Sequence, residues 1–209
     1  MNCITASCRI SGQSVSRNGD TVFENKDTDL PDFLLSGYQY FSGNYPKFYK
    51  MDNLSKLGWL AAEVLLKEGF LAGSYRPEEI GITLANANSS LDTDLKYFQT
   101  VKEIPSPALF VYTLPNIMIG EICIRHHIKG ESACFISPGF DADFMEWMVN
   151  DLMDNNELRA CICGWVDLLK DEHIAVLYLV EKETTEQFKD QAPAFLSFKK
   201  ENINKIFQG

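Results

Sequence analysis

PSPALFVYTLPNIMIGEICIRHHIKGESACFISPGFDADFMEWMVNDLMDNNELRACICGWVD, residues 105–167, is the stretch of sequence that decides the fold. Apolar residues at helical spacing predict a helix over 116–127, and ACFIS at 133–137 predicts a strand. A second helix is expected from Phe140 to about 153, followed by a strand over 159–167. Strands and helices therefore alternate, which is typical of α/β proteins.

The flanking sequence extends this alternation. Asp52 is expected to cap a helix over 53–68, with Gly69 and Gly73 at its end. Residues 13–50 are rich in Gly, Ser, Asn, Asp and aromatic residues and predict a long irregular insertion. The other expected elements are strands over 2–12, 80–85 and 173–181, a helix over 92–102, and a last helix over 185–190, 196–207 or both.

The strands over 159–167 and 173–181 are close enough in sequence to form a hairpin. We find no internal repeat and no low-complexity tract. We therefore expect a single domain over 1–209, with a mixed, mainly parallel five-stranded sheet and helices on both of its faces.

Composition and charge narrow the class of protein. The chain has 209 residues, 45% of them hydrophobic, and a formal net charge of −10. This charge argues against binding to nucleic acid or to an anionic membrane through a global field. No apolar run approaches the roughly 20 residues that span a bilayer, and MNCITASCRIS at the N-terminus does not resemble a signal peptide. We expect a cytoplasmic protein with reduced cysteines.

Cysteine and histidine spacings predict no metal site and no cofactor. None of the six cysteines forms a Cys-x-x-Cys pair, and the three histidines are better interpreted as solvated or core residues. No phosphate-binding loop, dinucleotide fingerprint, nucleophile elbow or zinc-protease motif is present. These patterns alone predict no more than a soluble α/β domain.

Short motifs along 45–180 resemble the N-terminal half of β-ketoacyl-acyl carrier protein synthases, members of the thiolase-like superfamily. The resemblance implies a thiolase-like N-terminal half. The motifs are Tyr49-Lys50-Met51-Asp52, Ile80-Gly81-Ile82, Leu114-Pro115-Asn116, Ile124-Arg125, Lys129-Gly130 and Gly164-Trp165-Val166-Asp167.

The resemblance also shows what is missing. Active synthases carry a nucleophilic cysteine in the turn before the long helix, where the helix N-terminus lowers the thiol pKa. The corresponding turn here is Ser137-Pro138-Gly139-Phe140, and gapless spacing places Gly139 at the cysteine position. Cys134 is expected inside the strand, and Ser137 lacks an obvious base, so that helix capping is its better interpretation. The family's catalytic histidines lie in a C-terminal repeat, and none of the three histidines here matches them.

The resemblance therefore implies a non-catalytic subunit of the chain-length-factor type, similar to truncated synthase-like proteins of aryl polyene and flexirubin-type pigment clusters. Its partner would be a full-length β-ketoacyl synthase, with an acyl carrier protein met only indirectly, because both the carrier and this chain are acidic. The alternatives are a split enzyme, an enzyme with rebuilt acyl-transfer chemistry, and a homodimeric acyl-binding or scaffold protein.

The family's dimer geometry implies which residues meet the partner. The strand over 133–137 would pair with its mate, and residues 106–119 would reach toward the partner's acyl tunnel. Aromatic and Met side chains there would shape a bound chain, although they could also be ordinary core or loop residues. The candidate substrate or interface residues are Phe110, Tyr112, Asn116, Ile117, Met118, Cys134 and Phe135.

Overall fold

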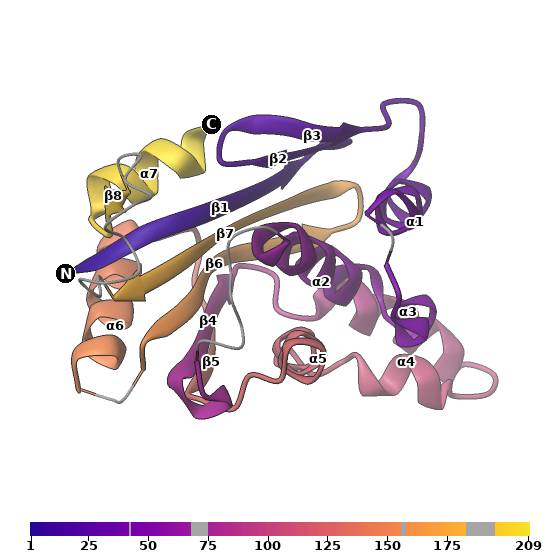
Figure 1. Cartoon of the computed structure of the whole chain (residues 1–209). Helices are drawn as coiled ribbons and strands as arrows, with labels where there is room; N and C mark the ends of the chain where they lie inside the picture. Colours follow the sequence, from indigo (N-terminus) through magenta and orange to yellow (C-terminus); the bar gives the residue numbers. More distant parts are fainter. Residues whose placement is uncertain (42, 68–74, 156–157, 183–194) are drawn as a thin grey trace.

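The computed structural model describes residues 1–41, 43–67, 75–155, 158–182 and 195–209. Its helices pack on a central sheet (Figure 1). In this part of the chain the sheet has eight strands in the order β3-β2-β1-β7-β6-β4-β5, with β8 beside β1. The strands are β1 (Asn2–Ser11), β2 (Ser14–Arg17), β3 (Asp20–Glu24), β4 (Ile80–Asn86), β5 (Ser132–Ile136), β6 (Ala160–Leu169), β7 (Glu172–Lys182) and β8 (Leu196–Ser197).

The α/β class and all five predicted strands are confirmed, but strand number and pairing differ from the prediction. Only β4 pairs in parallel, with β5 and β6, and the other pairs are antiparallel. The reason is the predicted β6–β7 hairpin, which reverses the chain and places β7 between β6 and β1. As a result β1, β4, β5 and β6 run in one direction and β7 in the other.

The predicted irregular insertion over 13–50 is wrong, because this region is largely regular. Asn18 and Gly19 have φ of 53° and 89° and form the two-residue turn between β2 and β3. Asn-Gly favours this turn because both residues tolerate positive φ. Farther on, the Asp29 carboxylate accepts a hydrogen bond from Asp32 N and caps α1 (Leu30–Tyr40), and η1 (Pro46–Lys50) follows.

Helices cover both faces of the sheet, as predicted (Figure 1). One core contains α1, α2 (Asn53–Leu66) and α5 (Ile117–His126), and the core on the opposite face contains α6 (Ala142–Asn155) and α7 (Lys200–Gln208). The remaining helices are η3 (Pro77–Glu79), α3 (Leu91–Val101) and the short α4 (Pro107–Val111). The sheet thus separates two apolar layers.

Most predicted helices lie where the sequence places them. Asp52 caps α2 by accepting a hydrogen bond from Ser55 N at 2.9 Å, as predicted. The expected helix ends at Gly69 and Gly73, and a helix over 185–190, lie outside the described residues. Among the residues that the structure does describe, no helix has both the length and the apolarity needed to cross a membrane.

Candidate functional site

The turn between β5 and α6 is the site that the sequence singles out. Ser137 N donates to Asn86 O at 3.0 Å, which fixes the turn to the end of β4. The Ser137 hydroxyl donates to Gly139 O at 2.9 Å. It does not cap α6, contrary to the prediction: Asp141 does so, accepting from Phe144 N at 2.9 Å, because a side-chain oxygen at that position reaches the third amide of the helix.

Gly139 offers no side chain for acyl transfer, and nothing in its backbone requires glycine. It is exposed, its φ is not positive, and a Cβ added to it would meet no atom within 4 Å. A cysteine would therefore fit at this position sterically. Crowding therefore does not explain the lack of a side chain at this position.

The surroundings of the turn disfavour a thiolate. The Asp141 carboxylate already accepts a hydrogen bond from an amide at the positive end of α6, and Asp143 lies in the first turn, 2.7 Å from Lys200 Nζ. Carboxylates beside a thiol raise its pKa. The last residue of the turn, Phe140, stacks on Phe207 of α7 with ring centroids 4.1 Å apart, so that it belongs to the packing between the turn and α7.

The two residues considered as substitute nucleophiles, Cys134 and Ser137, both contact backbone carbonyls. Cys134 lies in β5 with its Sγ 3.6 Å from Pro115 O, and burial raises the pKa of its thiol. Ser137 donates to a carbonyl and not to a base. The histidine contacts lie elsewhere: His126 Nε2 is 3.1 Å from Glu63 Oε1, and His173 contacts the carbonyls of Asp171 and Gly12.

The expected interface residues divide into exposed and buried ones. Phe110 is 58% exposed and packs only one side on Tyr97, with ring centroids 5.5 Å apart, and Asn116 is also exposed. Tyr112 and Met118 are buried in the core of this chain, which agrees with the alternative that they are ordinary core residues. Ile117 is partly buried against the same core.

An apolar surface surrounds Phe110. Large apolar side chains are partly exposed on the packed pair α3 and α4 and on the residues that connect and follow these helices. These side chains are Leu91, Leu95, Phe98, Val101, Ile104, Phe110, Val111 and Leu114. We call this set the α3–α4 surface. Exposed apolar side chains on neighbouring helices make this set a candidate interaction surface.

Strand β5 lies at one edge of the sheet, where it pairs with β4 alone among the described strands. Cys134 and Phe135 are half-buried, and Phe135 packs edge-on against Phe144 with ring centroids 4.9 Å apart. Ile136 is 51% exposed. The outer edge of β5 therefore presents backbone hydrogen-bonding groups beside an apolar side chain, an arrangement that favours pairing with another strand.

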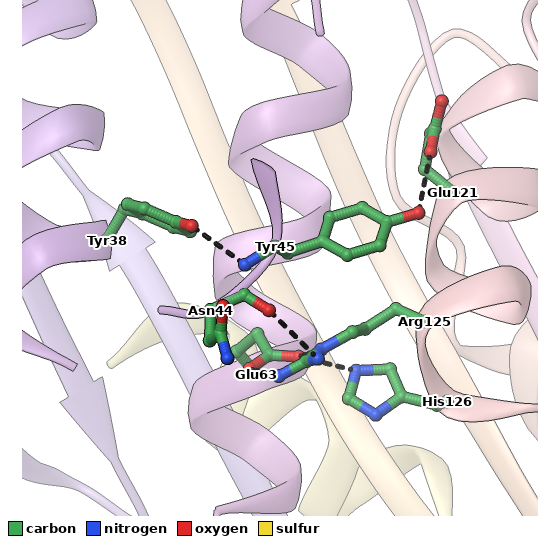
Figure 2. A network of polar contacts seen from close by, with 7 residues as sticks. All are labelled: Tyr38, Asn44, Tyr45, Glu63, Glu121, Arg125 and His126. Atoms are coloured by element: carbon green, nitrogen blue, oxygen red, sulfur yellow. Dashed lines mark hydrogen bonds and ion pairs between the residues drawn. The ribbon is translucent and has the colours of Figure 1, made fainter. Parts of the chain in front are cut away.

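The buried carboxylate of Glu121, in α5, contacts Tyr112 after α4 and two residues of the segment over 45–47. Glu121 is 3% exposed; it accepts hydrogen bonds from Tyr112 at 3.2 Å and Tyr45 at 3.4 Å and lies 2.8 Å from Lys47 Nζ (Figure 2 shows the Tyr45 bond). Burial and the Glu121 carboxylate raise the pKa of Tyr112 well above its usual range, so that this hydroxyl stays a donor. Glu121 thus fixes the residue that ends α4.

A second carboxylate, Glu63 of α2, binds α5 through Arg125 (Figure 2). Arg125 donates from Nε to Oε1 at 2.7 Å and from Nη2 to Oε2 at 3.1 Å, a bidentate geometry that arginine favours. Burial raises the pKa of Glu63, but contacts with His126 and Arg125 lower it by more, so that the carboxyl remains charged at neutral pH. Neither glutamate was predicted as a functional residue, although an acid inside the apolar pattern of 117–124 is a visible signal.

The last motif of the resemblance, at 164–167, also has a structural explanation. Gly164 has φ of 146°, and a Cβ there would lie 2.0 Å from Val176 O of the paired strand. The Asp167 carboxylate accepts hydrogen bonds from Ala87 N at 3.1 Å and from Asn88 N at 2.9 Å, which fixes the loop after β4. In the described residues, no group of three or more His, Cys, Asp or Glu side chains is placed to hold a metal ion.

Comparison with solved structures identifies the architecture. The ketosynthase/chain length factor of ishigamide has a TM-score of 0.61 and 15% identity, and the match covers 92% of this chain and 63% of that one. The chain has the ketosynthase fold. A ketosynthase (ApeO) in complex with its chain length factor (ApeC) from Xenorhabdus doucetiae matches with a TM-score of 0.55 at 13% identity, over 88% of this chain and 79% of that chain.

A third match is a type II polyketide ketosynthase bound to the hexaketide and to its acyl-carrier protein, with a TM-score of 0.61, 14% identity and coverage of 91% and 65%. This chain therefore spans less than two thirds of the length of some of the ketosynthase-fold chains that it resembles. No family model matches the sequence, and no curated protein matches it. The ketosynthase fold thus rests on structural likeness, which agrees with the motifs found along 45–180.

Proposed function

We propose that this chain is a non-catalytic ketosynthase-like subunit, of the chain-length-factor type, that pairs with an active β-ketoacyl synthase in the synthesis of a polyene or fatty-acyl chain. The observation that carries the proposal is Gly139, a residue without a nucleophile in the turn between β5 and α6 of a ketosynthase fold. Solved structures with this fold include a ketosynthase in complex with its chain length factor, which supports pairing as the role of a chain that lacks the nucleophile.

Two surfaces support the proposed pairing. The free edge of β5 can extend its sheet with a strand of the partner, and Ile136 beside it would be buried. The α3–α4 surface offers aromatic and aliphatic side chains, the residue types that contribute most to binding energy in interface cores. Glu121 holds Tyr112, the end of α4, to α5, so that this surface is presented on a fixed support.

The net charge of this chain supports the interpretation that the catalytic partner, and not this chain, binds the acyl carrier protein. A subunit of net charge −10 is a poor dock for an acidic acyl carrier protein. The carrier would therefore bind the catalytic partner, and this chain would contribute to the shape of the complex. Phe110 is the candidate from the α3–α4 surface that would reach toward the growing acyl chain.

Co-expression with full-length ketosynthases encoded in the same genome tests the proposal. We expect a 1:1 complex by native mass spectrometry and light scattering. Ile136→Lys on the β5 edge should abolish the complex, whereas Ile124→Lys, at an isoleucine 58% exposed on α5, should leave it intact. These two changes place the same charge on the same residue type at similar exposure.

Two results would replace the proposal with an alternative. A stable homodimer that ignores every synthase would favour the homodimeric acyl-binding or scaffold protein. Covalent transfer of an acyl group from an acyl-carrier thioester to any residue of this chain, detected as a mass increase, would favour rebuilt chemistry at Cys134 or Ser137.

A further inference from the structure

A cavity of about 510 Å³ lies at the outer edge of β1, between the β2–β3 turn, β8 and α7. On this edge β1 pairs with β8 at Cys3 and Ile4 and with β2 from Cys8 to Ser11. Residues 5–7, between these pairings, meet no strand there within the described chain, and the register with β7 shifts at this point. The gap in the sheet edge, with α7 alongside, opens the cavity.

Apolar side chains form the greater part of the cavity wall. They come from β1, from α7 and from residues at and beside β8, and they are Ile4, Ala6, Phe195, Leu196 and Ile206. The volume lies within the range of about 300–1,000 Å³ that is common for small-molecule sites. Such a wall favours an aliphatic chain over a polar ligand.

Among the described lining residues, the charged side chains are those of Arg9 and Lys205, both cationic, and none is Asp or Glu. Gly209 also lines the cavity, and a Cβ added to it would lie 3.5 Å from Arg9 Nε, so that Lys205 is the cation farther along α7 from the last residue. Arg9 uses Nη1 to donate to Phe207 O, which leaves other N–H donors of the guanidinium available. Ser7 also lines the cavity, is 8% exposed, and its hydroxyl makes no hydrogen bond within the described residues.

We propose that this cavity binds an amphiphilic carboxylate, with its aliphatic chain against Ile4, Leu196 and Ile206 and its carboxylate at Arg9 and Lys205. A carboxylate would accept charge-assisted hydrogen bonds from the guanidinium and the ammonium. The proposal does not rest on pairing with a synthase, since neither the β5 edge nor the α3–α4 surface contributes to the cavity.

Isothermal titration of the purified chain with decanoate and with 1-decanol tests the proposal. The two probes share a chain length and differ in the charged head. We expect saturable 1:1 binding of decanoate and at least tenfold weaker binding of decanol. Arg9→Gln should weaken decanoate at least tenfold, as expected for the loss of a charged hydrogen bond, and should leave decanol unchanged.

The controls separate the site from general charge effects and from folding. Lys129→Gln removes an exposed lysine outside the cavity and should change neither affinity. Because Arg9 also donates to Phe207 O of α7, Arg9→Gln removes a contact that helps to hold α7. Lys205→Gln alters an exposed side chain and provides the second test. Absence of decanoate binding to the wild-type chain would overturn the proposal. So would equal losses in Lys205→Gln and Lys129→Gln, or equal affinity for the two probes.

Discussion

A substitution of Phe110 can distinguish a role in binding the partner from a role in the stability of the isolated chain. Its side chain is 58% exposed and otherwise packs on Tyr97. Complete burial of a Phe side chain contributes about 1.5–3 kcal/mol. Burial of the exposed 58% by a partner would therefore contribute about 0.9–1.7 kcal/mol, which corresponds to an increase of about 4- to 16-fold in Kd for Phe110→Ala.

The isolated chain should tolerate the same change. The part of the Phe110 side chain that the chain itself buries contributes about 0.6–1.3 kcal/mol. The tilted contact with Tyr97 contributes about 0.5–1.5 kcal/mol beyond area burial, so the free energy of unfolding should fall by about 1–3 kcal/mol. Tyr40→Ala is the matched control, because Tyr40 is an aromatic residue 60% exposed that packs on Phe23, away from α4.

The assay is a titration of each variant against the immobilised synthase, with urea unfolding in parallel and mass spectrometry of the product. Phe110→Ala should weaken pairing or change product length, and Tyr40→Ala should do neither. If Phe110→Ala pairs within twofold of the wild type and gives the same product, or if Tyr40→Ala weakens pairing equally, the assignment of the α3–α4 surface is wrong.

Three further changes test the turn, the sheet and the buried ion pair. Gly139→Ala should leave the turnover of the reconstituted pair within about twofold, since a Cβ there meets no atom within 4 Å; lost turnover with normal pairing would give the turn a chemical role. Gly164→Ala should lower the free energy of unfolding in urea by about 3 kcal/mol or more, because the new Cβ would lie 2.0 Å from Val176 O, and a loss under 1 kcal/mol would contradict this reasoning. Because the pKa of Glu63 is lowered in the folded chain, its charged form stabilises the fold at pH values above the ordinary pKa of 4.5, and this stabilisation is lost as the pH falls through the lowered pKa. Glu63→Gln should therefore flatten the acid side of a curve of unfolding free energy against pH. An unchanged slope would count against the ion pair.

Local patterns predicted the elements better than their pairing. The helical spacing before Arg125 and the cap at Asp52 are short-range signals, and α5 and α2 lie where these signals place them. The sheet order depends on the β6–β7 hairpin returning between β6 and β1, which is a long-range outcome that alternation of elements does not specify. The N-terminal hairpin had a local signal, Asn18-Gly19, which its composition of turn residues concealed.

The candidate site was predictable only where a position could be aligned with a motif. The prediction for Gly139 was made in this way. The buried acids Glu121 and Glu63 were not predicted, because their role depends on α5 packing beside α2 and the 45–50 segment. Burial likewise separates Phe110 from Tyr112, two aromatic residues that look equivalent in sequence. Only the fold places one on the surface and the other against Glu121.

Three other positions of the motifs have a structural role in this chain. Gly164 has no room for a side chain, Asp167 holds the loop after β4, and Arg125 joins α5 to α2. The turn position that the resemblance assigns to the nucleophile is sterically open: Gly139 is exposed, its φ is not positive, and a Cβ added to it would meet no atom within 4 Å. A substitution at Gly139 should therefore cost little stability, whereas substitutions at Gly164, Asp167 or Arg125 remove contacts that hold the fold. This pattern is what the proposed partner role requires, because pairing depends on the geometry of β5, α3 and α4 and not on a thiol.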